Sequence, residues 1–194
     1  MPTVTRLRAV GTGRVEVEVD GERWRTFPEE VVVRAGLARG LELERPFLRA
    51  LRRELRRHRA LAAAKRALLA RPLSERRLDE RLRRRGFVAP ERAEAMETLR
   101  GVGLLDDERF ARGRAQILAE RDGGDALIRH DLRSQGIDED TVAQALAALE
   151  PESSRAVRAA APRGGGAAAA RYLTRRGFGQ DAIETAVGSV ADEP

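Results

Sequence analysis

The chain has 194 residues, of which 42% are hydrophobic, only 4% aromatic and 35% charged. It has no cysteine, which excludes disulfides, thiolate nucleophiles and cysteine-bound metals, and its two histidines are too few for a histidine-rich metal centre. The formal charge of +6 and the pI near 11.0 favour polyanionic partners. Lys65 is the only lysine, but genome base composition can produce such a preference for arginine, so it carries no functional inference.

No stretch approaches the ~18 uncharged apolar residues of a membrane-spanning helix, and no apolar signal segment follows Met1. A cytoplasmic protein is therefore expected. His58 and His130 have no serine, cysteine or aspartate arrangement to pair with, and the short glycine runs lack the residues of a phosphate loop. We expect no catalytic residue, no cofactor and no metal, and hence a protein that is not an enzyme.

The first 45 residues carry the pattern of a small β-rich domain. Charged and apolar residues alternate from Arg14 to Val19, which predicts a half-buried strand. Asp20-Gly21 is a hairpin signal, and residues 23–27 continue as the partner strand. Residues 3–9 are expected to supply a third strand, and residues 29–35 a short helix.

From residue 46 onward the apolar periodicity is helical. Pro46 stands in the favoured first turn of a long basic helix that runs to Ala70, either unbroken or interrupted near His58. Further helices are predicted, in chain order, at residues 74–86, 90–101, 106–122, 126–135, 138–149, 155–161, 167–176 and 181–190.

A helix end with a leucine, a glycine four residues later and then an apolar residue occurs three times, which is typical of a left-handed C-cap. These ends are Leu82 with Gly86-Phe87, Leu132 with Gly136-Ile137, and Leu173 with Gly177-Phe178. The glycines lie 50 and then 41 residues apart, within the range of helical repeat arrays. We therefore predict tandem three-helix units behind a β-rich domain, with boundaries at residues 1–45, 46–103, 104–150 and 151–194.

Asp106, Asp107 and Glu108 allow two interpretations. They could form a metal site, but Asp106 fits the N-cap of a helix, and acidic residues in a first turn suit the helix dipole. Helix capping explains all three residues, so the structural interpretation is preferred. In the same helix Phe110 and Ile117 are expected on the buried side.

Charge is distributed unevenly along the chain. Residues 49–87 hold 15 basic residues against 4 acidic ones, a net of +11. Residues 88–150 hold 8 basic residues against 14 acidic ones, a net of −6. The 44 C-terminal residues, 151–194, are nearly neutral, with 6 basic against 5 acidic. This asymmetry is more informative than the total charge.

Three blocks of the sequence resemble the RecX family of regulatory proteins, which modulate the RecA recombinase. They are Leu73 to Phe87, Gly103 to Ala111, and Leu132 to Asp138, joined by the terminal Arg175-Arg176-Gly177-Phe178. The segments around Asp20-Gly21-Glu22 and Gly36-Leu37 also resemble the amino-terminal extension of longer family members. The match spans most of the chain and is weakest over residues 153–170.

The resemblance implies a mainly α-helical fold, an elongated and curved array of tandem three-helix units. It implies a protein that binds RecA and the RecA filament on single-stranded DNA and inhibits ATP hydrolysis, strand exchange and co-protease activity, thereby modulating recombinational DNA repair. We expect a monomer whose direct binding to DNA is weak.

Arginines of the basic region are the candidates for contacts with DNA phosphates or with acidic surface on RecA. The candidates are Arg52, Arg53, Arg56, Arg57, Arg81, Arg83, Arg84, Arg85, Arg175 and Arg176. The residues expected to build and join the units are Leu78, Leu82, Gly86, Phe87, Asp106, Asp107, Phe110, Gly136, Ile137, Gly177 and Phe178.

Two other functions remain open at this point. Basic helices ending in glycine could form an independent DNA-binding module of the helix-turn-helix kind, although the acidic centre and the absence of asparagine argue against base reading. A structural scaffold whose basic surface reflects composition alone is the other alternative. Binding of short duplex DNA without RecA would distinguish the module from the regulator.

Overall fold

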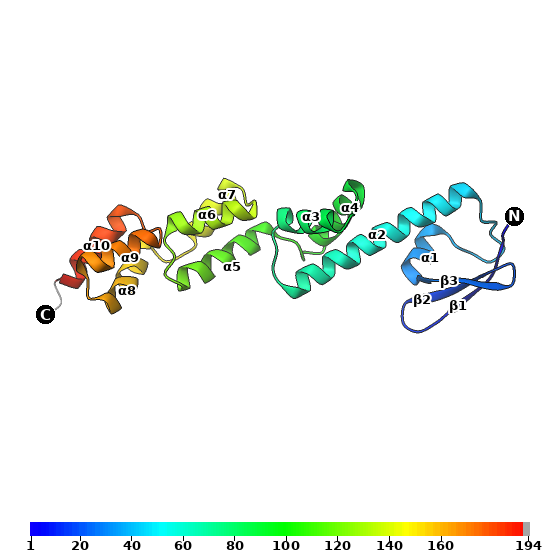
Figure 1. The fold of residues 1–194 in the computed structure, drawn as a ribbon, viewed down its shortest axis with the longest axis horizontal. Coiled ribbons are helices and arrows are strands. Elements are labelled where there is room, and N and C mark those ends of the chain that lie inside the picture. The colour runs from blue at the N-terminus through cyan, green and yellow to red at the C-terminus, as the bar shows by residue number, and fades with distance from the viewer. Residues whose placement is uncertain (192–194) are drawn as a thin grey trace. The chain divides into compact units, whose positions relative to one another are not determined.

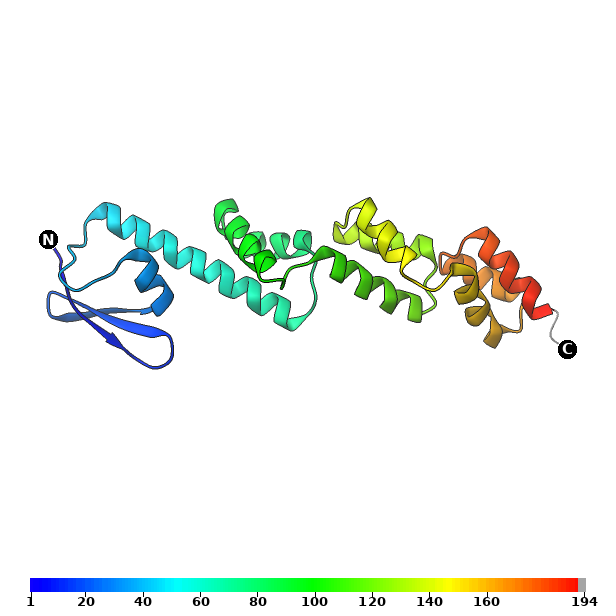
Figure 2. The same cartoon turned by 180° about the vertical axis from the view of Figure 1, so that it is seen from behind.

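A computed structural model describes residues 1–191, so the last three residues of the predicted unit 151–194 lie outside the described part. Figures 1 and 2 show a small sheet at the N-terminus followed by helices along the rest of the chain. The prediction of a mainly helical fold with a small β-rich N-terminal domain is confirmed. No helix within residues 1–191 is both long enough and apolar enough to cross a membrane.

The sheet is antiparallel, with strand order β1-β2-β3. Its strands are β1 (Val4–Ala9), β2 (Arg14–Val19) and β3 (Glu22–Pro28). The register of β2 with β3 jumps from the pair Val17–Arg25 to the pair Glu18–Arg23. Trp24 is therefore the extra residue of a β-bulge in β3, a distortion that bends a strand and redirects a side chain.

The helices follow the predicted order, and the long basic helix α2 is unbroken through His58. They are α1 (Glu29–Ala35), α2 (Arg45–Ala70), α3 (Glu75–Arg84), α4 (Ala89–Gly101), α5 (Asp107–Glu120), α6 (Asp125–Gln135), α7 (Glu139–Ala147), α8 (Glu152–Ala160), α9 (Gly166–Arg175) and α10 (Gln180–Ala191), with a short 3-10 turn, η1 (Ala161–Arg163), before α9.

The described chain divides into two compact units. The N-terminal unit comprises residues 1–66 and 82–98, and its apolar core joins the sheet to α1 and the start of α2 through side chains such as Val17, Phe27 and Leu51. The C-terminal unit comprises, of the described residues, 67–81 and 99–191. It holds two further cores, one built by α5 to α7 and one by α8 to α10.

The buried stripe of α5 consists of small residues. Ala111, Ala115 and Ala119 are buried at intervals of four residues, as one face of a helix requires. The expectation that Ile117 is buried is wrong, because it is 44% exposed. Ile117 lies two residues beyond Ala115, on the far side of the helix, whereas Phe110 is half-buried beside the stripe.

The three glycine-capped helix ends share one geometry. At each end, the glycine has a positive φ. The residue after the glycine donates its backbone N–H to the leucine carbonyl five residues earlier. The glycine itself donates its backbone N–H to the carbonyl three residues earlier. This is the Schellman motif. The φ angles are +81° at Gly86, +88° at Gly136 and +79° at Gly177. The leucines of these ends, Leu82, Leu132 and Leu173, are fully buried, as is Leu78.

Within the C-terminal unit, the glycine-capped end of α6 lies against the start of α3. A Cβ added to Gly136 would come within 2.7 Å of the Cβ of Arg76. Beside it Ser74 donates its hydroxyl to the carbonyl of Gln135 at 2.6 Å. Arg77 donates to the Gln135 side chain at 3.2 Å and to the Ser134 carbonyl at 2.7 Å. Long-range polar contacts therefore fix this joint.

The end of α9 lies against the start of α6 in the same way. A Cβ on Gly177 would come within 2.6 Å of the backbone nitrogen of Leu127. The backbone N–H of Gly124 donates to the Arg176 carbonyl at 2.9 Å, and that of Ala126 donates to the Gly177 carbonyl at 3.0 Å. Only glycine permits this close approach of two backbones.

Candidate interaction surface

The acidic triplet at the start of α5 is divided among separate structural partners. The Asp106 carboxylate accepts the backbone N–H of Arg109 at 2.8 Å and so caps α5. Asp107 accepts the backbone N–H of Glu75 at 2.8 Å. Glu108 pairs with Arg112 at 3.6 Å. Among the described residues, no group of three or more acidic or histidine side chains is placed to hold a metal ion.

The arginines of α2 fall into two groups with different surroundings. Leu48, Leu51 and Leu55 face the core of the N-terminal unit and fix which side of the helix is exposed. Arg52 and Arg53 are exposed and have no acidic partner among the described residues. They are free to bind an external anion.

Arg56, the next candidate along α2, is bound by other residues of the N-terminal unit. Its guanidinium makes two contacts with the Glu91 carboxylate, at 2.5 and 3.3 Å, and a third with the Gly86 carbonyl at 3.5 Å. Glu91 is only 6% exposed and also accepts the backbone N–H of Val88 at 3.1 Å. The hydrogen bond to Glu91 raises the pKa of Arg56 above its ordinary value. Arg56 therefore connects α2 to the first turn of α4 and to the glycine-capped end that precedes α4.

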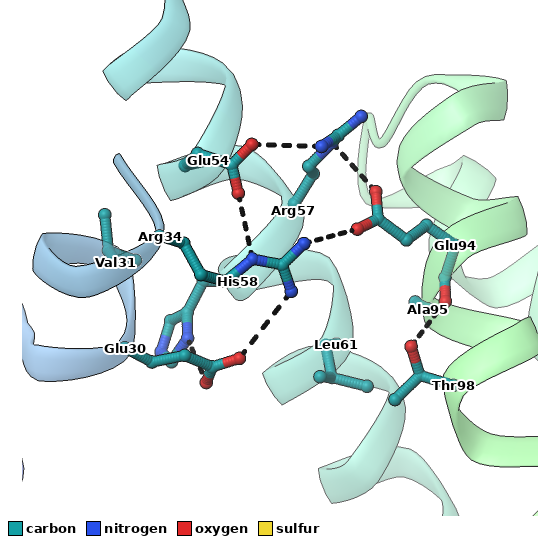
Figure 3. A pocket seen from close by; sticks show the side chains of 10 residues that line it. All are labelled: Glu30, Val31, Arg34, Glu54, Arg57, His58, Leu61, Glu94, Ala95 and Thr98. Carbon is teal, nitrogen blue, oxygen red and sulfur yellow. Dashed lines mark hydrogen bonds and ion pairs between the residues drawn. The ribbon is translucent and has the colours of Figure 1, made fainter. Parts of the chain in front are cut away.

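Arg57 belongs to an ion-pair cluster that joins α1, α2 and α4 (Figure 3). It contacts Glu54 at 2.9 Å and Glu94 at 2.8 Å. Arg34 of α1 contacts the same two carboxylates, at 3.3 and 3.0 Å. His58 lies at the edge of this cluster, with its Nδ1 3.4 Å from Glu30. The guanidinium of Arg57 is therefore shared between two internal carboxylates.

The arginines at the end of α3 are largely free. Arg83, Arg84 and Arg85 are exposed and have no acidic partner within residues 1–191, and Arg81 is half-buried, likewise without one. Positive charge at a helix C-terminus is favoured by the helix dipole, so these arginines also stabilise their own helix. The contact of Arg56 with the Gly86 carbonyl places Arg83 to Arg85 next to α2 within the N-terminal unit.

Of the two candidates at the end of α9, one is internal. Arg176 donates its Nε to the Asp122 carbonyl at 3.0 Å and its Nη2 to the Arg121 carbonyl. Arg175 is exposed and has no acidic partner in the described chain. The sequence pattern cannot separate such neighbours, because their partners lie more than 50 positions away.

Five of the ten candidates are thus free cations of the N-terminal unit. These are Arg52, Arg53, Arg83, Arg84 and Arg85. The sequence interpretation missed Arg14, Arg25 and Arg59, which are also exposed and free of acidic partners among residues 1–191. For Arg25 the sequence did offer a signal, because Arg23 and Arg25 flank Trp24, the only tryptophan of the chain.

These features define a mainly helical protein with an arginine-rich surface, in which successive three-helix units follow a small N-terminal sheet along the chain. The family model described as RecX, second three-helix domain, matches residues 106–146. The protein named Regulatory protein RecX of Halorhodospira halophila is 32% identical over 145 residues, which cover 68% of this chain and 87% of that protein. The chain belongs to the RecX family.

Other members differ in the extent of the match. The Regulatory protein RecX of Syntrophotalea carbinolica is 43% identical over 99 residues, covering 50% of this chain and 64% of that protein, which is just under two thirds. That of Deinococcus radiodurans is 31% identical over 150 residues, covering 72% of each chain.

Two solved structures share the fold. A crystal structure of a regulatory protein RecX superposes with a TM-score of 0.83 at 21% identity and covers 100% of both chains. A crystal structure of RecX from Lactobacillus salivarius has a TM-score of 0.63 at 18% identity and covers 70% of this chain and 97% of that one. The first match includes the N-terminal sheet, because it spans the whole chain.

Proposed function

We propose that this protein binds the RecA recombinase and the RecA filament on single-stranded DNA, and that it inhibits ATP hydrolysis, strand exchange and co-protease activity. The observation that carries the proposal is membership of the RecX family, whose named relatives are regulatory proteins. The proposed protein is cytoplasmic and monomeric, has no catalytic step of its own, and modulates recombinational DNA repair. Its proposed three-helix units span residues 46–103, 104–150 and 151–194.

The free arginines support a polyanionic partner. Arg83, Arg84 and Arg85 are exposed cations without internal compensation among the described residues, so an incoming phosphate or carboxylate displaces only water and counterions. Guanidinium groups can bind either anion with two parallel hydrogen bonds. Such contacts position a partner and carry no base specificity.

The proposed inhibition works by binding alone. A ligand shifts a conformational equilibrium only as far as it prefers one state over the other. We propose that the chain prefers a filament state that hydrolyses ATP slowly or disassembles. No reacting group from this chain is then needed.

The test is a titration of RecA's DNA-stimulated ATPase with the protein at two salt concentrations. We expect inhibition at substoichiometric to stoichiometric ratios, and weaker inhibition at the higher salt, because phosphate contacts lose affinity as salt rises. Full ATPase activity at every ratio and at both salt concentrations would refute the proposal.

The second candidate is an independent DNA-binding module, which the number of uncompensated arginines favours. It predicts tight binding of short duplex DNA without RecA, together with no inhibition of the ATPase beyond competition for DNA. Adding excess DNA to the titration separates the two, because only competition is relieved.

A further inference from the structure

An arginine-rimmed groove runs between the edge strand β3 and the helix α2, wholly within the N-terminal unit. One hollow of about 440 Å³ is lined by Trp24, Arg25, Phe27, Leu48, Leu51, Arg52 and Leu55. A second hollow, of about 250 Å³, is lined by Arg14, Arg25, Thr26, Phe27, Pro28, Leu55, His58 and Arg59. Arg25, Phe27 and Leu55 line both hollows, so the two adjoin, and together they are called the groove here. The larger hollow lies within the roughly 300–1,000 Å³ of ligand sites.

The floor of the groove is apolar and partly aromatic. Trp24 is 40% exposed although it is the only tryptophan of the chain. Its ring lies 5.3 Å from that of the buried Phe27, measured between centroids. The β-bulge in β3 gives Trp24 its position, because it is the residue without a partner in β2. Bulges commonly redirect a side chain toward a functional site.

All of the formally charged side chains that line the groove are arginines. Arg14, Arg25, Arg52 and Arg59 line it, and none has an acidic partner among residues 1–191. No carboxylate lines either hollow. Other arginines of the same unit are compensated, such as Arg56 by Glu91 and Arg57 by Glu54 and Glu94. The groove therefore combines uncompensated positive charge with a partly exposed tryptophan.

We propose that this groove binds single-stranded nucleic acid, with a base stacked on Trp24 and phosphates held by the arginines of the rim. Basic grooves with aromatic platforms are the usual means of binding single strands without sequence preference, because every base has a stacking face. A duplex hides those faces, so it cannot use Trp24 in the same way. An acidic peptide would satisfy the arginines but would leave the exposed indole face without its best partner.

This proposal does not rest on the proposed regulation of RecA, and its test contains no RecA. The protein is titrated with an oligothymidylate of about 12 nucleotides, within the range of single-strand site sizes. Emission of Trp24 reports occupancy directly, because no other tryptophan contributes. Anisotropy of a labelled oligonucleotide reports total binding. Duplex DNA and polyglutamate serve as alternative occupants.

We expect saturable quenching of Trp24 by the single strand and weaker binding of the duplex. Trp24→Leu should weaken binding roughly 5- to 100-fold, since stacking on one aromatic side chain has about that effect, and Trp24→Phe should retain most of the affinity. Arg25→Gln with Arg52→Gln should reduce the slope of log K against log salt by about 1.4, from about 0.7 for each phosphate contact on a single strand. The matched control is Arg39→Gln with Arg71→Gln, two exposed arginines outside the groove that also have no acidic partner in the described chain.

Several results would overturn the proposal. They are unchanged affinity in both Trp24→Leu and the Arg25/Arg52 variant, absence of quenching by the single strand, and polyglutamate or duplex DNA binding as tightly as the single strand. Circular dichroism shows whether each variant remains folded. If Trp24→Leu unfolds, quenching of the parent protein and the Phe variant still decide the outcome.

Discussion

The carboxylate of Asp107, in the first turn of α5, accepts the backbone N–H of Glu75, at the start of α3, at a distance of 2.8 Å. Glu152, the first residue of α8, does the same for Asp125 at the start of α6, at 2.6 Å. An acidic residue that opens one helix thus caps an earlier helix, 32 and 27 positions back in the sequence. This recurrence links successive parts of the C-terminal unit in a common way.

Asp107 should tolerate asparagine but not alanine. Burial raises the pKa of the Asp107 carboxyl above its ordinary value of 3.8, although the hydrogen bond from Glu75 opposes that shift. The folded state therefore holds this proton to higher pH than the unfolded chain does. The resulting stabilisation is present below pH 3.8 and is lost as the pH rises through the raised folded value.

At pH 7 the neutral Asp107→Asn variant should be at least as stable as the parent, because its amide oxygen keeps the cap without the buried charge. Asp107→Ala should lose about 1 kcal/mol, as is usual when a helix cap is removed. Urea unfolding at pH 7 measures both. A loss for Asn equal to that for Ala would show that the helix start requires the charge.

The three cap glycines should differ in their tolerance of alanine. A Cβ added to Gly86 would meet no atom within 4 Å. Gly86→Ala should therefore lower the free energy of unfolding by only about 1–2 kcal/mol, which is the cost of holding an alanine in the left-handed conformation. Gly136→Ala should cost more, because Arg76 must move, and Gly177→Ala most, because the obstacle is the backbone of Leu127. Thermal unfolding of the three variants measures the order, and equal losses would contradict it.

Arg155 should be essential for folding of the C-terminal unit. It is only 4% exposed, pairs with Asp125, and donates to the carbonyls of Gly123 at 2.7 Å and Glu150 at 2.9 Å. Arg155→Met should cost about 3–5 kcal/mol, the usual effect of breaking a buried pair. Arg158→Met on the same helix is the control and should cost less than about 1 kcal/mol, because its pair with Glu150 is exposed. Unfolding in urea compares them.

Arg56 should behave as a structural residue, unlike Arg53 three positions earlier. Arg56→Gln breaks the pair with the buried Glu91 and should cost about 1–2 kcal/mol, less than a fully buried pair because half of the Arg56 side chain is exposed. Arg53→Gln should leave the free energy of unfolding within about 0.5 kcal/mol. If the two variants unfold at the same denaturant concentration, the structural role assigned to the Arg56–Glu91 pair is wrong.

The arginines at the end of α3 should affect inhibition of RecA more than stability. Replacing Arg83, Arg84 and Arg85 together with glutamine should raise the concentration needed for half-inhibition of the ATPase by about three- to a hundredfold, from about 0.2–1 kcal/mol for each exposed charge contact. Helix content by circular dichroism should be unchanged.

The control for that experiment changes the net charge equally at scattered exposed sites, by replacing Arg39, Arg71 and Arg171 with glutamine. Its inhibition should match that of the parent protein. Equal loss in the control and in the α3 variant would mean that only net charge matters, as the scaffold alternative holds.

Local sequence patterns were sufficient for the features that depend on neighbours a few positions away. The Schellman ends at Gly86, Gly136 and Gly177 and the cap at Asp106 arise from contacts within five residues, so the local pattern predicts them. The strands of the sheet and the order of the helices follow from periodicities of two and of about 3.6 residues. The same local information cannot rank the exposed residues by function.

For Arg52 and Arg56, tertiary packing decides which arginine is free. Arg52 and Arg56 look alike in the sequence, and both are exposed, but only Arg56 has an acidic partner, Glu91, which lies 35 positions away. The bulge that presents Trp24 depends on the register of two paired strands, and the close approach of Gly177 to Leu127 depends on how two helices meet. Such contacts form when distant segments pack, so no local periodicity contains them.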